Sequence, residues 1–349
     1  MTLPPKLQSM TPYTPVTGNY PVRLDANESF MTPPYWLRRE IADALSRVPL
    51  HRYPDPLALG VREKASSLYG IQSEQVIAGN GSDELIGLIM AALVPRGGRV
   101  LLTDPDFSMY QFYAELYELD CRAVGKIGRR PDIDAVLREA EQWHPDLVIF
   151  SNPCNPTGLG APRGEVIRLL KGVTCPVVVD EAYMDFWDQS VMEDLPNFEN
   201  LVILKTCSKA CGLAGLRLGF AMAGPEIMDA LFKTKSPYNV NALTQAAGEV
   251  VLSHPRYLRN CAEKIKDVTQ ALFDKLQAIA GRVGGALTVL STETNFVLLQ
   301  TPDAAGIFEG LRTRGILVRQ LDGDLLRVTA GSGAEQTALF GALEEILPL

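Results

Sequence analysis

Short apolar runs alternate with helix-length segments between residues 76 and 204, and this alternation constrains the fold of the chain more than any other feature. The runs lie at 76–78, 100–102, 147–150, 177–179 and 201–204. Helices are expected between them at 79–93, 108–118, 132–143 and 163–171, with one more strand near 121–124. Buried strands that alternate with helices predict an α/β fold with a doubly wound, mostly parallel sheet. Such sheets bind ligands just beyond the carboxyl ends of their strands.

The last hundred residues follow a different pattern, in which strands and helices alternate less regularly. We expect a long amphipathic helix at 257–280, strands at 286–290, 295–299, 316–319 and 325–329, and helices at 304–313 and 334–346. This pattern predicts a second, smaller α+β domain. Residues 1–20 are rich in Pro and Thr and predict an extended arm that packs on it. The expected division is a large domain of residues 40–245 and a small domain of residues 1–39 and 246–349.

Charge and composition argue against several kinds of partner. The 349 residues carry a net charge of −8, which disfavours binding to nucleic acid or to an anionic membrane. No apolar run approaches the roughly 20 residues of a membrane-spanning helix. The six cysteines show no Cys-x-x-Cys spacing and there are only three histidines, so no metal site is expected. Scattered cysteines are typical of reduced thiols in a cytoplasmic protein.

Lys209, just beyond the apolar run at 201–204, is the strongest candidate for a catalytic residue. The run predicts a buried strand, and Thr206, Ser208 and Lys209 follow it closely. Three glycines between 212 and 219 predict a tight, close-packed turn, and Arg217 lies within it. Such a lysine can form a Schiff base with an aldehyde cofactor whose phosphate is held by the hydroxyls and the arginine. The alternative is a solvated surface lysine, which the apolar approach and the glycines disfavour.

A pyridoxal phosphate site also needs a carboxylate for the pyridine nitrogen. Asp180 follows the buried strand at 177–179, where it could keep that nitrogen protonated. A helix N-cap is the alternative role for an aspartate in this position. Tyr183, three residues further on, could reach the same ring.

The remaining parts of such a site are a donor to the ring hydroxyl, a flat residue against the ring and a phosphate cradle. Asn155, in the proline-pinned turn at 152–158, is a suitable amide donor, although an ordinary turn has the same sequence character. Phe107 could stack on the ring or belong to the core. The run Gly81-Ser82-Asp83 opens a helix whose amides and dipole suit a phosphate.

Taken together, these segments resemble one enzyme family over nearly the whole chain. The motifs are RLDANES at 23–29, HRYPDP at 51–56, GNGSDE at 79–84, NPCNPTG at 152–158, VVDEAY at 178–183, TCSKACGLAGLRLGF at 206–220 and the late VRQ and LRVTAG at 318–320 and 326–331. They resemble fold-type I pyridoxal-phosphate-dependent aminotransferases of class II, and most closely the histidinol-phosphate aminotransferases. Two departures stand out: Cys154 replaces an asparagine of the family's turn, and residues 330–335 read AGSGAE where the family has Gly-Thr-Arg-Glu. The second departure bears on the substrate and not on the chemistry.

The resemblance implies a role for each candidate residue. Lys209 would bond to the cofactor, Asp180 would pair with its ring nitrogen, Asn155 and Tyr183 would face its ring hydroxyl, Phe107 would stack on the ring, and Thr206, Ser208, Arg217, Gly81, Ser82 and Asp83 would hold its phosphate. On the substrate side, Asn27 would face the substrate, and Tyr13, Arg319 and Arg327 would bind its anionic end. Tyr53 would reach the cofactor phosphate of a partner subunit, which implies a homodimer with composite active sites.

The implied activity is transfer of an amino group between histidinol phosphate and 2-oxoglutarate or glutamate, in histidine biosynthesis. Three alternatives stay open. The donor could be an aromatic or other amino acid, the reaction could be a lyase reaction like that of threonine-phosphate decarboxylases, or the chain could be a non-catalytic sensing module. The RYPDP loop and the GLAGLRLG segment favour an aminotransferase over the lyase, and the acidic charge disfavours a DNA-associated sensing module.

Overall fold

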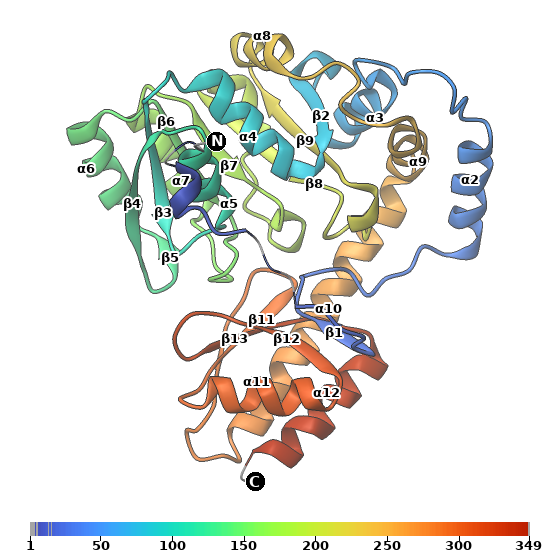
Figure 1. Ribbon diagram of the computed structural model, residues 1–349, viewed down its shortest axis with the longest axis vertical. Coiled ribbons are helices and arrows are strands. Elements are labelled where there is room, and N and C mark those ends of the chain that lie inside the picture. Colours follow the sequence, from blue (N-terminus) through green and yellow to red (C-terminus); the bar gives the residue numbers. More distant parts are fainter. Residues whose placement is uncertain (1–3, 5, 13, 15, 348–349) are drawn as a thin grey trace.

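Two β-sheets, each covered by helices, make up the computed structural model, which describes residues 4, 6–12, 14 and 16–347 (Figure 1). The larger sheet has the strand order β2-β9-β8-β7-β6-β3-β4-β5. Its strands are β2 (Val76–Asn80), β3 (Arg99–Asp104), β4 (Asp120–Ile127), β5 (Arg130–Pro131), β6 (Leu147–Ser151), β7 (Val177–Asp180), β8 (Leu201–Thr206) and β9 (Leu218–Ala223). Neighbouring strands from β4 through β3, β6 and β7 to β8 are parallel, which confirms the mostly parallel sheet expected from the sequence.

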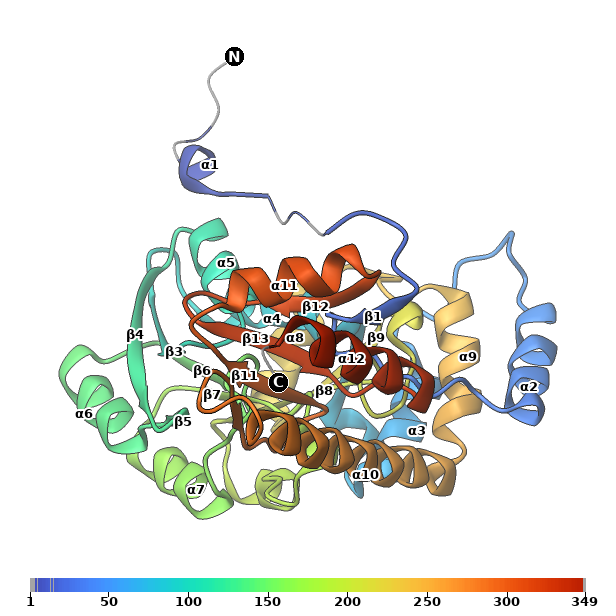
Figure 2. The ribbon, with the colours of Figure 1, turned by 90° about the horizontal axis from the view of Figure 1, so that it is seen from below.

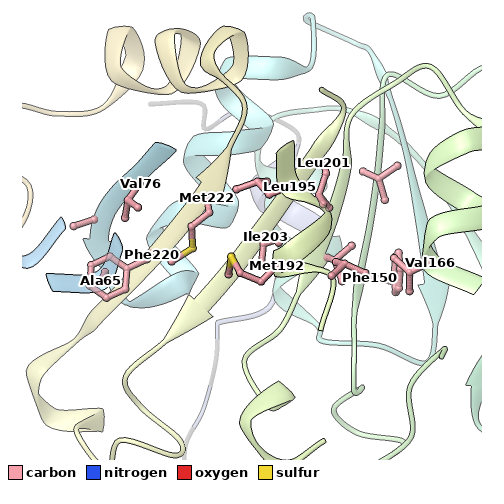
Figure 3. Close-up of a cluster of buried hydrophobic side chains, with 14 of the residues drawn as sticks. Ala65, Val76, Phe150, Val166, Met192, Leu195, Leu201, Ile203, Phe220 and Met222 are labelled. Carbon is pink, nitrogen blue, oxygen red and sulfur yellow. The ribbon is translucent and has the colours of Figure 1, made fainter. Parts of the chain in front are cut away.

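Helices cover both faces of the larger sheet, and alternate residues of its strands enter two separate cores. The helices are α3 (Leu59–Tyr69), α4 (Gly81–Leu93), α5 (Met109–Leu116), α6 (Ile133–Trp143), α7 (Arg163–Gly172), α8 (Pro225–Thr234) and α9 (Ala242–Leu252). In β7, Val178 packs in the cluster that contains residues of α4, α5 and α8, whereas Val177 and Val179 join the cluster of α6 and α7. Figure 3 shows part of the second cluster, with Phe150 on β6 and Ile203 on β8, the strands on either side of β7. Burial on both faces explains why these strands are continuous apolar runs.

Strand β9 is the main feature of the sheet that the sequence did not predict. The glycine-rich segment after Lys209 was interpreted as a turn, but Leu218–Ala223 forms a strand that pairs antiparallel with both β2 and β8. Gly219 lies opposite Gly79 on one side and Thr206 on the other. A Cβ on Gly219 would lie 2.3 Å from the backbone nitrogen of Ser82, so only glycine fits where the strand passes the start of α4. Helices α8 and α9 were likewise not predicted.

The smaller sheet joins strands from both ends of the chain, in the order β1-β12-β13-β11-β10. These are β1 (Val22–Leu24), β10 (Thr288–Leu290), β11 (Phe296–Gln300), β12 (Ile316–Gln320) and β13 (Leu325–Thr329). Strand β1 is parallel to β12, and the other pairs are antiparallel. Residues of α10 (Pro255–Ala280), α11 (Ala304–Thr313) and α12 (Gly333–Ile346) share one hydrophobic cluster with this sheet. The strands and helices expected here are confirmed to within a few residues.

The N-terminal segment differs in part from the expected extended arm. Residues Lys6–Ser9 form a short helix, α1, which Figure 2 shows at the edge of the molecule. Lys6 Nζ donates a hydrogen bond of 2.7 Å to the carbonyl of Leu116, at the end of α5. The chain then passes through β1 to α2 (Tyr35–Ser46), which lies beside α9 (Figure 1).

Candidate active site

A cavity of about 1090 Å³ lies between the two sheets, where the carboxyl ends of β3, β6, β7 and β8 face residues of β12 and β13. Most of the residues singled out in the sequence line it, although they come from distant parts of the chain. These are Asn27, Ser82, Asp83, Phe107, Asn155, Asp180, Tyr183, Thr206, Ser208, Lys209, Arg217, Arg319 and Arg327. The position is the one expected for a ligand site of a parallel α/β sheet.

Lys209 is half-buried in the loop after β8 and lines the cavity. Its Nζ donates a hydrogen bond of 3.1 Å to the carbonyl of Ala26 and lies 5.6 Å from the centre of the Tyr183 ring. The lysine is therefore held between the loop after β1 and the segment after β7, with its amine inside the cavity.

Asp180 is a buried carboxylate at the end of β7, with only 3% of its surface exposed. Its Oδ2 accepts a hydrogen bond of 2.8 Å from the hydroxyl of Tyr110, and its Oδ1 accepts one of 3.0 Å from the amide of Ala182. Burial raises the pKa of Asp180 to about 6, while the Tyr110 hydroxyl and the Ala182 amide act in the opposite direction. The alternative role as a helix N-cap is not supported, because the next helical turn begins at Met184 and has Tyr183 in the capping position.

One corner of the cavity has the donors that a phosphate requires. Thr206 Oγ1 and Ser208 Oγ lie 3.0 Å apart, and Arg217 Nη1 lies 3.5 Å from Ser208 Oγ. Helix α4 begins at Gly81 in a left-handed conformation, and a Cβ there would lie 2.7 Å from Arg217 Nη2. The amides of the helix start, two hydroxyls and a guanidinium thus converge on one point, which suits a dianion.

Asp83 occupies an unusual place at the same helix start. Its Oδ1 is buried and has no hydrogen-bond partner among the residues that the structure describes. Burial raises the pKa of its carboxyl, although the charge of Arg217 acts in the opposite direction. An unsatisfied buried carboxylate oxygen is an acceptor and calls for a hydrogen-bond donor at this helix start.

Tyr183 and Asn155, the two residues expected to face a ring hydroxyl, each accept a hydrogen bond from the side of the smaller sheet. The hydroxyl of Tyr183 accepts a hydrogen bond of 2.9 Å from Asn27 Nδ2. Asn155 Oδ1 accepts a short hydrogen bond from Arg327 Nη1. Phe107 also lines the cavity and meets Tyr110 edge to face, with 5.6 Å between ring centres.

Asn27 joins the smaller sheet to the segment after β7. It is 1% exposed, adopts a left-handed conformation with φ of 53°, and has its polar groups satisfied. Its amide donates to Thr329 Oγ1 at 3.0 Å, the Thr329 hydroxyl donates to its Oδ1 at 3.1 Å, and Asn295 Nδ2 donates to its carbonyl at 3.1 Å. Because its side chain also reaches Tyr183, Asn27 links β13 to the segment after β7.

Two arginines come from the smaller sheet. Arg319 and Arg327 are opposite each other on β12 and β13, and both line the cavity. Arg327 also donates a hydrogen bond of 2.6 Å to the carbonyl of Asp25. Tyr13, the third residue expected to bind an anionic end, lies outside the described residues.

Tyr53 lies outside this cavity, and Gly81, at the start of α4, is not among its lining residues either. The surface of Tyr53 is 81% exposed, and its ring stacks on that of Tyr238 with 4.6 Å between centres.

Sequence reasoning did not identify Tyr110, Asp106, Lys126 or Thr329 as parts of the site. The first two lie in the same DPDFSMY segment as Phe107, which was the available signal. The other two are ordinary strand residues in the sequence. In the described part of the chain, no group of three or more His, Cys, Asp or Glu residues could hold a metal ion. Likewise, no helix within that part is long and apolar enough to cross a membrane.

The site is suited to a cofactor that carries both a phosphate and an electrophilic carbonyl, because a phosphate corner lies in one cavity with a lysine amine and a buried carboxylate. The family model for aminotransferases of class I and II matches residues 20–344, and the chain belongs to this family. Membership makes the protein a transaminase that acts on small-molecule amino donors and oxo acids, and it implies pyridoxal phosphate as the cofactor.

Individual proteins show how far the similarity extends. The histidinol-phosphate aminotransferase of Clostridium kluyveri is 36% identical over 352 residues, covering 98% of this chain and 97% of that protein. The histidinol-phosphate aminotransferase of Thermococcus gammatolerans is 36% identical over 347 residues, covering 97% and 96%. The crystal structure of histidinol-phosphate aminotransferase from Sinorhizobium meliloti in complex with pyridoxal-5'-phosphate has a TM-score of 0.88 at 24% identity, covering 99% and 97%. This last likeness shows that the fold is the same.

Proposed function

We propose that the protein moves an amino group between histidinol phosphate and 2-oxoglutarate or glutamate, as a step of histidine biosynthesis, with pyridoxal 5'-phosphate bound in the cavity. The observation that carries the proposal is the position of Lys209, with its amine in the same cavity as Asp180 and the phosphate corner. The family of the chain and the names of its relatives in Clostridium and Thermococcus support the substrate.

The residues present fit the cofactor part by part. Lys209 would hold its aldehyde carbon and Asp180 its ring nitrogen, while Asn155 and Tyr183 would bind its ring hydroxyl. Phe107 would cover one face of the ring. Gly81, Ser82, Asp83, Thr206, Ser208 and Arg217 would surround its phosphate, with the donors coming from the amides of the helix start, the hydroxyls and the guanidinium. When bound, the cofactor supplies an electrophilic carbonyl and a ring that accepts an electron pair.

The residues of the chain would then carry out the proton movements. The incoming amine would free Lys209 Nζ. Lys209 Nζ would then take the proton from the substrate carbon and give it to the cofactor carbon that carried the aldehyde. Positioned acid–base transfer of this kind contributes roughly 10²–10⁴-fold to a rate. Asp180 would hold a proton on the ring nitrogen. Burial and the hydrogen bond from Tyr110 keep its carboxylate in one position. Tyr183, fixed by Asn27, would hold the ring oxygen in place.

The substrate side must accept a phosphate in one half-reaction and carboxylates in the other. Arg319 and Arg327 lie side by side on the cavity wall and would bind either anion, with Asn27 at the same side. We propose that Tyr13 closes over the same anion. Two arginines suit a dianionic phosphate better than one would, which supports histidinol phosphate over an amino acid that carries a single α-carboxylate.

We propose that the active protein is a homodimer in which Tyr53 reaches the partner's cofactor phosphate. Support comes from large apolar side chains that are exposed within residues 35–59 and 238–243. They are Tyr35, Trp36, Leu50, Tyr53, Leu57, Leu59, Tyr238 and Leu243. Tyr53 and Tyr238 stack on each other, and exposed apolar groups that gather in this way are typical of a surface that another subunit covers.

Two further proposals concern organisation and location. We propose a large domain of residues 40–245 and a small domain of residues 1–39 and 246–349, because each sheet has its own hydrophobic clusters. We also propose a cytoplasmic location, because all six cysteines are free thiols, which fits a reducing compartment.

The test of the proposed function is direct. Purified protein loaded with pyridoxal phosphate would be incubated with 2-oxoglutarate and either histidinol phosphate, phenylalanine or tyrosine, and glutamate would be measured. Borohydride reduction followed by peptide mass spectrometry should place the cofactor on Lys209. Label on another lysine contradicts the site. Faster turnover with an aromatic amino acid contradicts the substrate, and release of CO₂ without glutamate points to a lyase.

A further inference from the structure

Asp180 has two buried carboxylate neighbours, and each of them is paired with a buried lysine. Asp106 lies in the turn after β3 and Glu181 directly follows Asp180 in the chain. Their side chains are 4% and 0% exposed. Carboxylates buried this close together repel one another unless cations compensate them.

Lys126, on β4, compensates Asp106. Its side chain is 2% exposed, and its Nζ lies 3.1 Å from Asp106 Oδ2 and 2.9 Å from Cys154 Sγ. Burial lowers the pKa of Lys126, but the charge of Asp106 and the interaction with Cys154, with the hydrogen bonds to both, together outweigh it, so that the pKa is raised and the amine stays charged. Asp106 also accepts hydrogen bonds from Thr103 and from the amide of Phe107. The pair therefore ties β4 to the turn that carries Phe107.

Lys205, on β8, compensates Glu181 in the same way. Its side chain is 5% exposed, and its Nζ lies 2.9 Å from Glu181 Oε2. Burial lowers the pKa of Lys205, but Glu181 and Asp185 outweigh it and raise the pKa. Glu181 accepts two more hydrogen bonds, from Ser190 and from the amide of Val191. This pair ties the ends of β7 and β8 together.

The titratable groups around Asp180 come from every element packed against it. Tyr110 from α5, Asp106 from the turn after β3 and Glu181 from the segment after β7 act on it directly, and Lys209 from the loop after β8 lines the same cavity. Lys126 from β4 and Lys205 from β8 are paired with the two carboxylates. After burial, which raises the pKa of Asp180 most, both Asp106 and Glu181 raise it further, and Tyr110 lowers it. Without the two lysines, the charges of Asp106 and Glu181 would act on Asp180 more strongly than they do.

We propose that Lys126 and Lys205 are positioning residues of the cofactor site, which neutralise Asp106 and Glu181 and so keep Asp180 ionised for the cofactor's ring nitrogen. The inference rests on the proposed cofactor site and adds to it two residues that do not touch the cofactor. Its physical basis is that removing one partner of a buried ion pair leaves the other charge uncompensated, whereas removing both leaves none.

The test measures the affinity of the cofactor-free protein for pyridoxal phosphate between pH 5 and pH 9. Lys126→Met should move the acid limb of the affinity profile upward by about one pH unit, which near pH 6 means roughly tenfold weaker binding. Lys126→Met/Asp106→Asn, which removes both charges, should return the limb to the wild-type position. Lys205→Met should move the limb in the same direction. Because Asp185 also lies beside Lys205, the matching rescue removes both carboxylates, in Lys205→Met/Glu181→Gln/Asp185→Asn.

Controls separate this effect from simple loss of structure. Lys233→Met, which breaks an exposed ion pair with Asp229 on α8, should leave the profile unchanged. If Lys126→Met protein does not fold, Lys126→Gln replaces it. An unmoved limb in the single variants overturns the inference, as does a double variant that stays as shifted as the single one. If wild-type protein binds no pyridoxal phosphate at any pH, the proposed function fails and the inference fails with it. If wild-type protein binds the cofactor but the single variants keep the wild-type acid limb, only the inference fails.

Discussion

Replacement of Gly219 by alanine tests whether the close approach of β9 to the start of α4 shapes the phosphate corner. A Cβ at Gly219 would lie 2.3 Å from the amide nitrogen of Ser82 and 2.5 Å from the carbonyl carbon of Gly81. Ordinary contacts begin near 3.5 Å, so β9 and the helix start must separate by about 1 Å. Strand β9 is hydrogen-bonded on both sides, to β2 and β8, so the helix start is the part that moves.

The displacement has two measurable costs. Overpacking of this kind lowers the free energy of unfolding by about 1–3 kcal/mol. The amides of Gly81 and Ser82 also lose their alignment with a bound phosphate. Hydrogen bonds to a charged group contribute about 1.5–3 kcal/mol, so the affinity for pyridoxal phosphate should fall roughly 10- to 100-fold.

A matched control is Gly125, a strand glycine of β4 in the same sheet that does not line the cavity. A Cβ at Gly125 would have no atom within 4 Å, so Gly125→Ala should change the free energy of unfolding by less than about 0.5 kcal/mol and leave cofactor affinity unchanged. Both variants would be titrated with pyridoxal phosphate by absorbance and unfolded by heat without cofactor. Wild-type affinity in Gly219→Ala protein, or an equal loss in both variants, would refute the reasoning.

Three further predictions concern the ring nitrogen, the substrate and the dimer. Tyr110→Phe removes a donor that lowers the pKa of Asp180, which is about 6 in the cofactor-free protein. Because cofactor affinity is lost as pH falls through that pKa, the loss should begin at higher pH in the variant; an unshifted profile would exclude a role for the hydroxyl. Arg319→Leu should reduce kcat/KM for histidinol phosphate by about 10- to 100-fold, and less for glutamate, from a charge-assisted contact of roughly 1.5–3 kcal/mol; equal losses would favour a general amino-acid aminotransferase. Mixing Tyr53→Phe and Lys209→Ala subunits should restore activity, because one site of the mixed dimer then carries both changes and the other neither, and proven mixed dimers without activity would argue against composite sites.

Local sequence patterns were sufficient to predict that most of the candidate residues lie together. Lys209 and Asp180 each follow an apolar run, and such runs are buried strands because both faces of a parallel sheet are covered. The carboxyl ends of parallel strands meet at one edge, so residues that follow the runs are brought together whatever the details of packing. The cavity that contains both residues agrees with this expectation.

Tertiary structure alone decided the contacts that hold these residues in place. Asn27 and Thr329 are 302 positions apart, and their hydrogen bond exists only because β13 meets the loop after β1. The pairing of Lys126 with Asp106 and the insertion of β9 between β2 and β8 likewise depend on strand order. Hydrophobic periodicity in a sequence indicates which residues of a helix or strand are buried, because the apolar face of each element packs against the core. It does not report which distant strand becomes a neighbour, because that choice is made by the packing of whole sheets and helices against one another.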